Sequence, residues 1–155
     1  MRPNCLSFES YSEDVEFDIV LNFNHGDSLS YGTENNELTG VILREAYSVH
    51  TALGAGLLES AYKECLFYKL QKAGLFVEKE KVMPLVFEDV KLDCGYRIDL
   101  LVENKIVLEL KSVEALNDVH SAQVLTYMRL GKFKIGYLMN FNVTSLKNGI
   151  KRFVL

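Results

Sequence analysis

Two short segments, Tyr96–Val102 and Ile106–Lys111, restrict the fold more than any other part of the chain. Both alternate between apolar and other residues and are separated by only three polar residues. Alternation is typical of β-strands, in which successive side chains point to opposite faces, and so short a connection requires an antiparallel hairpin. One face of this hairpin is wholly apolar and is expected to lie against a helix. Its members are Tyr96, Ile98, Leu100, Val102, Ile106, Leu108 and Leu110.

The other face of the predicted hairpin carries two carboxylates. A tight turn centred on Asn104 places Asp99 directly opposite Glu109, with Cβ atoms roughly 4.5–5.5 Å apart. Carboxylates this close repel each other unless one is protonated or a cation lies between them. Oxygen ligands of this kind suit Mg²⁺ or Mn²⁺, and Lys111 lies two residues further along the same face.

The same pattern has a plainer interpretation. A solvent-facing hairpin whose acidic side chains pair with lysines across the strands is common, and short motifs often match by chance. A slip of one residue in the register would also move Asp99 to the opposite face from Glu109. The metal-site hypothesis therefore depends on the geometry of the turn.

Two predicted helices carry further polar candidates for the same site. Glu59 stands in the first turn of a helix predicted over residues 57–73, where an acidic residue also complements the helix dipole. Gln123 and Tyr127 are four residues apart on a helix capped by Asn117, so they share one face. Taken alone, Gln123 and Tyr127 are better explained as ordinary half-buried positions, and Glu59 is well explained by the helix dipole.

The periodicity along the chain predicts an α/β domain over residues 37–155, preceded by an acidic extension over residues 1–36. The extension is expected to be weakly ordered or to hold one strand, at residues 15–23. In the domain, the order of elements implies a mixed β-sheet flanked by helices. Helices are predicted at 37–53, 57–73 and 117–130, and strands at 76–80, 82–87, 96–102, 106–111, 133–139 and 152–154.

The charge is distributed unevenly along the chain. Residues 1–36 hold one basic and seven acidic residues, whereas no acidic residue follows Asp118. A stretch with this composition favours a basic face that binds nucleic acid, although a solvated surface with acidic neighbours explains it equally well. The basic residues of this stretch are Arg129, Lys132, Lys134, Lys147, Lys151 and Arg152.

Cysteine content and hydropathy indicate the compartment. Cys5, Cys65 and Cys94 form no CxxC pair and are odd in number, so reduced thiols of a cytoplasmic protein are expected rather than a disulfide framework or a zinc site. The apolar stretches are far shorter than the roughly 18 residues of a membrane span, and the N-terminus lacks the apolar stretch of a secretory signal. No membrane partner is therefore expected.

Several motifs together resemble the GxxExxY family of the PD-(D/E)XK nuclease superfamily. The likeness extends over residues 38–155, and a tail at residues 140–152 contributes to it. The remaining motifs are Gly56-x-x-Glu59-x-x-Tyr62, the segment Leu92–Val102 around Asp99, and Glu109-Leu110-Lys111.

The resemblance implies a PD-(D/E)XK nuclease-like α/β core, a central mixed sheet flanked by helices, and Mg²⁺ or Mn²⁺ bound at the edge of the sheet. It also implies roles for individual residues of this chain. The implied metal ligands are Asp99, Glu109, Glu59 and the carbonyl of Leu110. Lys111 corresponds to the catalytic lysine, which acts with the acidic residues, and Gln123 and Tyr127 correspond to a substrate-positioning QxxxY element.

The expected function is that of a metal-dependent nuclease that hydrolyses phosphodiester bonds, with DNA as the expected substrate and RNA left open. The alternative is a non-catalytic module that retains the nuclease fold and binds nucleic acid or a protein. A divalent-metal titration separates the two, because only the enzyme requires a metal site. Endonuclease or exonuclease action and homodimer formation are also left open.

Overall fold

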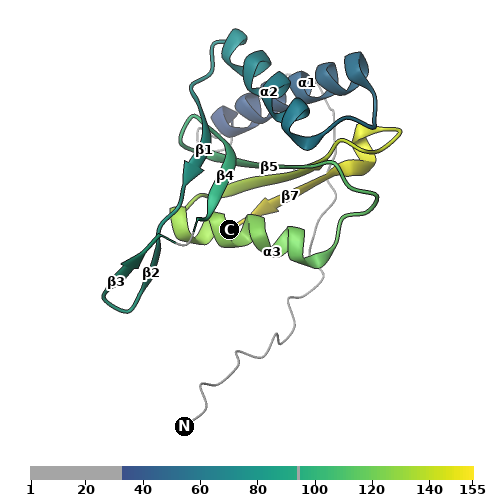
Figure 1. Ribbon diagram of the computed structural model, residues 1–155. Helices are drawn as coiled ribbons and strands as arrows, with labels where there is room; N and C mark the ends of the chain where they lie inside the picture. The colour runs from purple at the N-terminus through teal and green to yellow at the C-terminus, as the bar shows by residue number, and fades with distance from the viewer. Residues whose placement is uncertain (1–32, 94) are drawn as a thin grey trace.

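The computed structural model describes residues 33–93 and 95–155, whose elements form three layers (Figure 1). Two helices, α1 (Thr33–Leu53) and α2 (Glu59–Lys72), cover one face of a central sheet, and α3 (Asp118–Gly131) covers the other face. Each layer contact is apolar, which is how helices and sheets bury their hydrophobic faces. The predicted fold class, a mixed sheet flanked by helices, is confirmed.

The central sheet has five strands in the order β1-β4-β5-β6-β7. Neighbouring strands are antiparallel except for β5 and β6, which are parallel. A parallel pair needs a long crossover connection, and α3 provides it. The strands are β1 (Val77–Val82), β4 (Arg97–Val102), β5 (Ile106–Lys111), β6 (Ile135–Asn140) and β7 (Ile150–Val154).

The turn between β4 and β5 has the predicted register. Leu100 pairs with Leu108 and Val102 with Ile106, which is the register of a turn centred on Asn104. The chain reverses here because Glu103 and Asn104 both adopt a left-handed backbone with φ of 52°, as tight hairpin turns require. The same register places Asp99 opposite Glu109, one residue beyond the paired part of β4.

One face of the hairpin is not continuous as predicted. Leu100 and Val102 pack toward α1 and α2 as expected, whereas Ile98 packs with Leu101 in the core under α3. Tyr96 is exposed before the start of β4, and its ring contacts that of Tyr127 on α3, with a centroid distance of 6.5 Å. The alternation changes phase at the position of Asp99 because regular pairing with β5 ends at Leu100 there.

The prediction of one strand over residues 82–87 was wrong. The chain instead ends β1 at Val82 and forms a separate hairpin from β2 (Leu85–Phe87) and β3 (Val90–Leu92), of which β3 was not predicted. Pro84 has no backbone N–H to continue a sheet ladder. The hairpin projects from the domain beside β1 and β4 (Figure 1).

Some predictions lie outside the described residues, including the strand at residues 15–23 and the states of Cys5 and Cys94. Helix α1 begins at Thr33, earlier than the predicted start at residue 37. In the described parts of the chain, no helix is long and apolar enough to span a membrane.

Candidate active site

The carboxylate of Asp99 is held from two sides at the end of the β4–β5 hairpin. The residue is buried, and its Oδ2 accepts a hydrogen bond of 2.9 Å from the backbone N–H of Leu110 on β5. Its Oδ1 accepts a bond of 2.9 Å from Nζ of Lys63 on α2. Both oxygens are therefore engaged, which fixes the orientation of the carboxylate.

Glu109 faces Asp99 across the hairpin and is only 2% exposed. Its Oε1 accepts a hydrogen bond of 2.7 Å from Nζ of Lys111. Its Oε2 is buried and has no hydrogen-bond partner among the described residues. Burial and the negative charge of Asp99 raise the pKa of Glu109 to about 7, although Lys111 acts in the opposite direction.

Lys111 ends β5, half-buried beside Glu109. Burial lowers the pKa of Lys111, but its hydrogen bond and ion pair with Glu109, together with the charges of Glu59 and Asp99, outweigh this and raise the pKa above its usual value. The ammonium group is therefore charged at neutral pH and contacts the carboxylate of Glu109, on the strand face where the sequence predicted it.

The backbone that follows Lys111 is anchored by the adjacent strand. The N–H of Phe141 donates to the carbonyl of Lys111 at 2.8 Å. The buried amide side chain of Asn140 accepts from the N–H of Val113 at 3.1 Å and donates to its carbonyl at 2.9 Å. The Asn-Phe-Asn tail motif thus has a structural role in holding the end of β5 in place.

The Gly56-x-x-Glu59-x-x-Tyr62 motif forms the connection between α1 and α2. Gly56 has a φ of 99°, a backbone conformation that residues with a side chain rarely adopt. The hydroxyl of Tyr62 donates to the carbonyl of Gly54 at 2.6 Å and accepts from the N–H of Leu57 at 3.1 Å. The glycine and tyrosine of the motif therefore shape the turn that places Glu59 at the first position of α2.

Glu59 lies near the carboxylate pair without completing a cluster of ligands. Ser112, just after β5, donates to the carbonyl of Leu57 at 2.7 Å and so ties this turn to the site. The charge of Glu59 contributes to the raised pKa values of Glu109 and Lys111. Within residues 33–93 and 95–155, however, no three His, Cys, Asp or Glu side chains form a group suited to a metal ion.

Helix α3 covers the face of the sheet that α1 and α2 do not cover, and borders the site from that side. Gln123 donates to the hydroxyl of Tyr127 at 2.9 Å, and the charges of Glu109 and Asp99 both act on Tyr127. Burial is the main reason that the pKa of Tyr127 is raised. The two residues of the QxxxY element thus form one hydrogen-bonded unit near the carboxylates.

Two residues of the site were not predicted from the sequence. Lys63 of α2 forms ion pairs with both Asp99 and Glu80, and Glu80 lies on β1 at the position opposite Asp99. Burial lowers the pKa of Lys63, but hydrogen bonds to Glu80 and Asp99 outweigh this and raise it. The spacing of four residues from Glu59 was a signal for Lys63, because such residues share a helix face.

The six basic residues of the C-terminal stretch do not gather on one face. Lys151 and Arg152 are neighbours on β7 and therefore point to opposite faces of the sheet. Lys132 and Lys134 precede β6, whereas the site lies beside the other end of that strand, where Asn140 pairs with Lys111. A strand of this length spans about 20 Å. The role of the six basic residues in binding nucleic acid stays a prediction.

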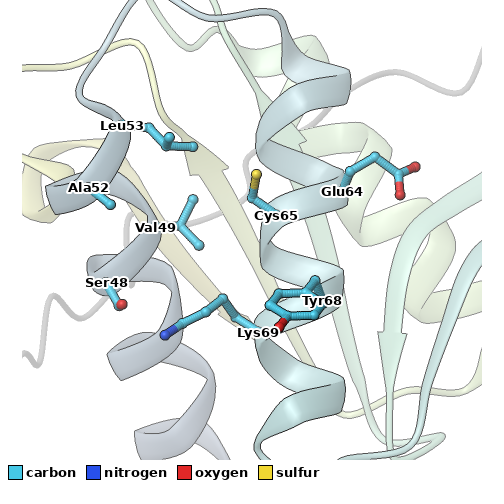
Figure 2. A pocket seen from close by; sticks show the side chains of 8 residues that line it. All are labelled: Ser48, Val49, Ala52, Leu53, Glu64, Cys65, Tyr68 and Lys69. Carbon is cyan, nitrogen blue, oxygen red and sulfur yellow. The ribbon is translucent and has the colours of Figure 1, made fainter.

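An apolar cleft of about 370 Å³ lies between α1 and α2 and contains none of these site residues (Figure 2). Figure 2 shows the side chains of Val49 and Leu53 on α1 facing those of Cys65 and Tyr68 on α2. The carboxylate that lines it, Glu64, is exposed and pairs with Lys79, so the cleft does not repeat the buried carboxylate pair at the end of the β4–β5 hairpin.

The donor set at that hairpin fits a hard divalent cation. Beside the carboxylate of Asp99, Glu109 offers a buried oxygen that has no partner within residues 33–93 and 95–155. A buried polar atom without a partner is costly unless a ligand satisfies it. Carboxylate oxygens are the ligands that Mg²⁺ and Mn²⁺ prefer. The two side chains supply part of a coordination shell, which backbone carbonyls, water and substrate phosphate complete in sites of this type.

Comparison with known proteins agrees with this arrangement. Residues 36–153 match the family model described as the PD-(D/E)XK nuclease superfamily. The match covers most of the chain and all the site residues described above, so the chain belongs to this superfamily. No curated protein and no solved structure matches the chain.

Proposed function

We propose that this protein is a Mg²⁺- or Mn²⁺-dependent nuclease of the GxxExxY type, which hydrolyses phosphodiester bonds in DNA. One observation carries the proposal: Glu109 is buried beside Asp99 with an oxygen that no described group satisfies. Membership in a superfamily of nucleases supports it. The turn before α2, which the hydroxyl of Tyr62 holds through the carbonyl of Gly54, supports it as well.

The proposed ligands are the carboxylates of Asp99 and Glu109 and the carbonyl of Leu110, with Glu59 acting through water. When bound, the cation supplies Lewis acidity that polarises the phosphate and offsets its growing negative charge. The hydrogen bond from the backbone N–H of Leu110 keeps Asp99 in place before the cation arrives, so little reorganisation is needed at the moment of reaction.

Lys111 is the proposed catalytic lysine. Its ammonium group stays charged, and its bond to Glu109 keeps it at the carboxylate pair. From there it orients the attacking water and counters the charge that develops on the phosphate, a contribution made chiefly in the transition state. The hydrogen-bonded pair Gln123–Tyr127 positions the substrate from the side of α3.

The basic residues of the C-terminal stretch are proposed to contact the nucleic-acid backbone. Such contacts carry little sequence information and weaken as salt rises. Because they lie at different ends and faces of the sheet, a long substrate that follows the surface would engage more of them than a short one.

The decisive test is a cleavage assay on plasmid, linear DNA and RNA, with Mg²⁺ or Mn²⁺ and with a chelator. We expect the wild-type protein to cut DNA only with the cation, and Asp99→Asn to lose cleavage because a metal ligand is removed. An Asp93→Asn variant, changed at an exposed carboxylate before β4, is the matched control. Equal cleavage by the Asp99→Asn variant would reject this site.

The alternative is a non-catalytic module that keeps the fold and binds a protein or nucleic acid. The β2–β3 hairpin favours a protein partner, since Phe87 is 65% exposed and Val90, its cross-strand partner, is 55% exposed. Exposed apolar clusters often mark interaction surfaces. If the protein cuts no DNA or RNA with any divalent cation, this alternative replaces the nuclease proposal.

A further inference from the structure

Lys63 occupies the site in a way that the proposed cleavage reaction does not explain. We propose that Lys63 is a positioning residue: it holds Oδ1 of Asp99 while no divalent cation is bound, and withdraws onto Glu80 when the cation takes that oxygen. This inference rests on the proposed function, because it concerns the same metal site.

The two oxygens of Asp99 have partners of different kinds. Its Oδ2 accepts from the backbone N–H of Leu110, a bond between two strands of one sheet. Its Oδ1 is bonded to the ammonium group of Lys63 at 2.9 Å. Each carboxylate oxygen has two lone pairs, but only Oδ1 has a side chain as its partner, so a divalent cation that binds Oδ1 meets the ammonium group of Lys63.

The side chains of Lys63 and Asp99 are both largely buried. The side chain of Lys63 is 14% exposed and that of Asp99 is 11% exposed, so water screens this pair poorly. Two positive charges at one buried oxygen repel each other strongly, because Coulomb energies grow as the effective dielectric falls. Lys63 and the cation are therefore competitors for Asp99 rather than joint occupants.

A second carboxylate already anchors Lys63. Its ammonium group also pairs with Glu80 on β1, whose side chain is far more exposed than that of Asp99. Lys63 can release Asp99 and keep one carboxylate partner. Its departure then costs one ion pair instead of leaving a buried charge without any partner, which would be strongly destabilising.

The backbone at Glu80 agrees with this role. Glu80 has a φ of 54°, in the left-handed region that residues with a side chain seldom adopt. It interrupts the ladder with β4 between the pairs formed by Lys79 and Lys81. Such strain is kept where the surroundings enforce it and is often found at functional sites. Here it accompanies the position that carries the second anchor.

The test is the affinity for Mn²⁺, measured by calorimetric titration of the full-length protein. We expect Lys63→Met to bind Mn²⁺ about tenfold more tightly than the wild type, which corresponds to about 1.4 kcal/mol, and to melt at a lower temperature without metal. A purely structural role predicts the opposite sign for affinity, since a disordered Asp99 would bind the ion more weakly.

The chain offers a matched control. Lys79 on β1 pairs with Glu64 on α2 at 2.7 Å. Lys79→Met therefore also removes one positive charge from an ion pair between α2 and β1, but outside the site. Its Mn²⁺ affinity should stay within about twofold of the wild type. An equal gain in both variants would indicate a general charge effect and overturn the role of Lys63.

The Glu80→Gln variant tests the second anchor and does not depend on the folding of Lys63→Met. Without Glu80, Lys63 is held by Asp99 alone, so Mn²⁺ should bind more weakly than in the wild type. In the Lys63→Met/Glu80→Gln double variant, the effect of Glu80→Gln should largely disappear, because it acts through Lys63. An undiminished effect in the double variant contradicts the proposal.

The failure of this inference is distinguishable from the failure of the proposed function. If the wild type binds Mn²⁺ but Lys63→Met binds it equally or more weakly, only the role of Lys63 is rejected. If neither protein binds Mn²⁺, the metal site itself is absent, and both proposals are overturned.

Discussion

Two lysine–carboxylate pairs lie side by side at the end of the hairpin, and they differ in origin. Lys111 and Glu109 come from one strand, two residues apart, so the periodicity of β5 alone puts them on one face. Lys63 and Asp99 come from α2 and β4 and meet only because the helix packs over the sheet. Similar chemistry is thus produced once by local and once by tertiary structure.

The two carboxylates also differ in what they leave available. Asp99 has both oxygens bonded, whereas Glu109 keeps one buried oxygen without a described partner. An unsatisfied buried acceptor costs about 1–3 kcal/mol, which is a poor arrangement for stability and a suitable one for binding a ligand. Asp99 is thus fixed in orientation, whereas Glu109 keeps an oxygen that is available to bind a ligand.

The largest expected effect concerns the pair within the strand. Lys111→Ala should lower cleavage by about 10²–10⁴, the usual loss for a transition-state electrostatic or acid–base group. DNA affinity should change much less. The measurement is single-turnover cleavage beside a Lys91→Ala control, which alters an exposed lysine of β3 that has no proposed role in the site. Unchanged cleavage in Lys111→Ala would remove the functional difference between the two pairs.

The next effect concerns the carboxylate of the tertiary pair. A ligand that binds only the native state at about 100 times its Kd stabilises it by about 2.7 kcal/mol. Saturating Mg²⁺ or Mn²⁺ should therefore raise the Tm of the wild type, and Asp99→Asn should abolish most of that rise. Thermal melts with and without the cation measure it. A full shift in the variant would place the cation elsewhere.

The raised pKa of Glu109 predicts a pH dependence of stability. Its pKa is about 7 in the folded protein, against an ordinary value of 4.5, so over this pH range the folded state retains a proton that the unfolded state releases. Without metal, the free energy of unfolding of the wild type should therefore fall between about pH 4.5 and pH 7, relative to Glu109→Gln, by about 3 kcal/mol.

Chemical denaturation of both proteins at several pH values measures this difference. The control is Glu64→Gln, which changes an exposed carboxylate of α2. The difference in unfolding free energy between the wild type and this variant should stay constant over the same pH range. If the wild type instead gains stability over this range relative to Glu109→Gln, Glu109 is ionised and well stabilised in the folded protein. The two carboxylates would then not differ as described.

The smallest effect concerns a motif residue outside both pairs. Tyr62→Phe removes two hydrogen bonds in the turn before α2 and should cost about 1 kcal/mol of stability. Cleavage should stay within a few-fold of the wild type, because the hydroxyl contacts no site residue in the structure described. A loss as large as that of Lys111→Ala would show that the tyrosine belongs to the chemistry.

The sequence allowed the core of the site to be predicted wherever the controlling structure is local. The turn at Asn104 sets the register of β4 and β5, and the register brings Asp99 to Glu109. The capping residue of α3 was also predictable: Asn117 accepts from the N–H of His120 at 3.1 Å. Turn geometry, strand alternation and helix caps each depend on a few neighbouring residues, which is why the sequence determined them.

The contacts between layers were decided by the tertiary structure alone. Ile98 packs on the opposite side from its predicted partners because the β4–β5 ladder ends before Asp99. Lys63 reaches Asp99, and Glu80 faces it, because α2 and β1 flank the same strand. The pKa of Glu109 follows from the depth at which the three layers bury it. Residues distant in sequence share no local periodicity, so their meeting depends on how the layers pack.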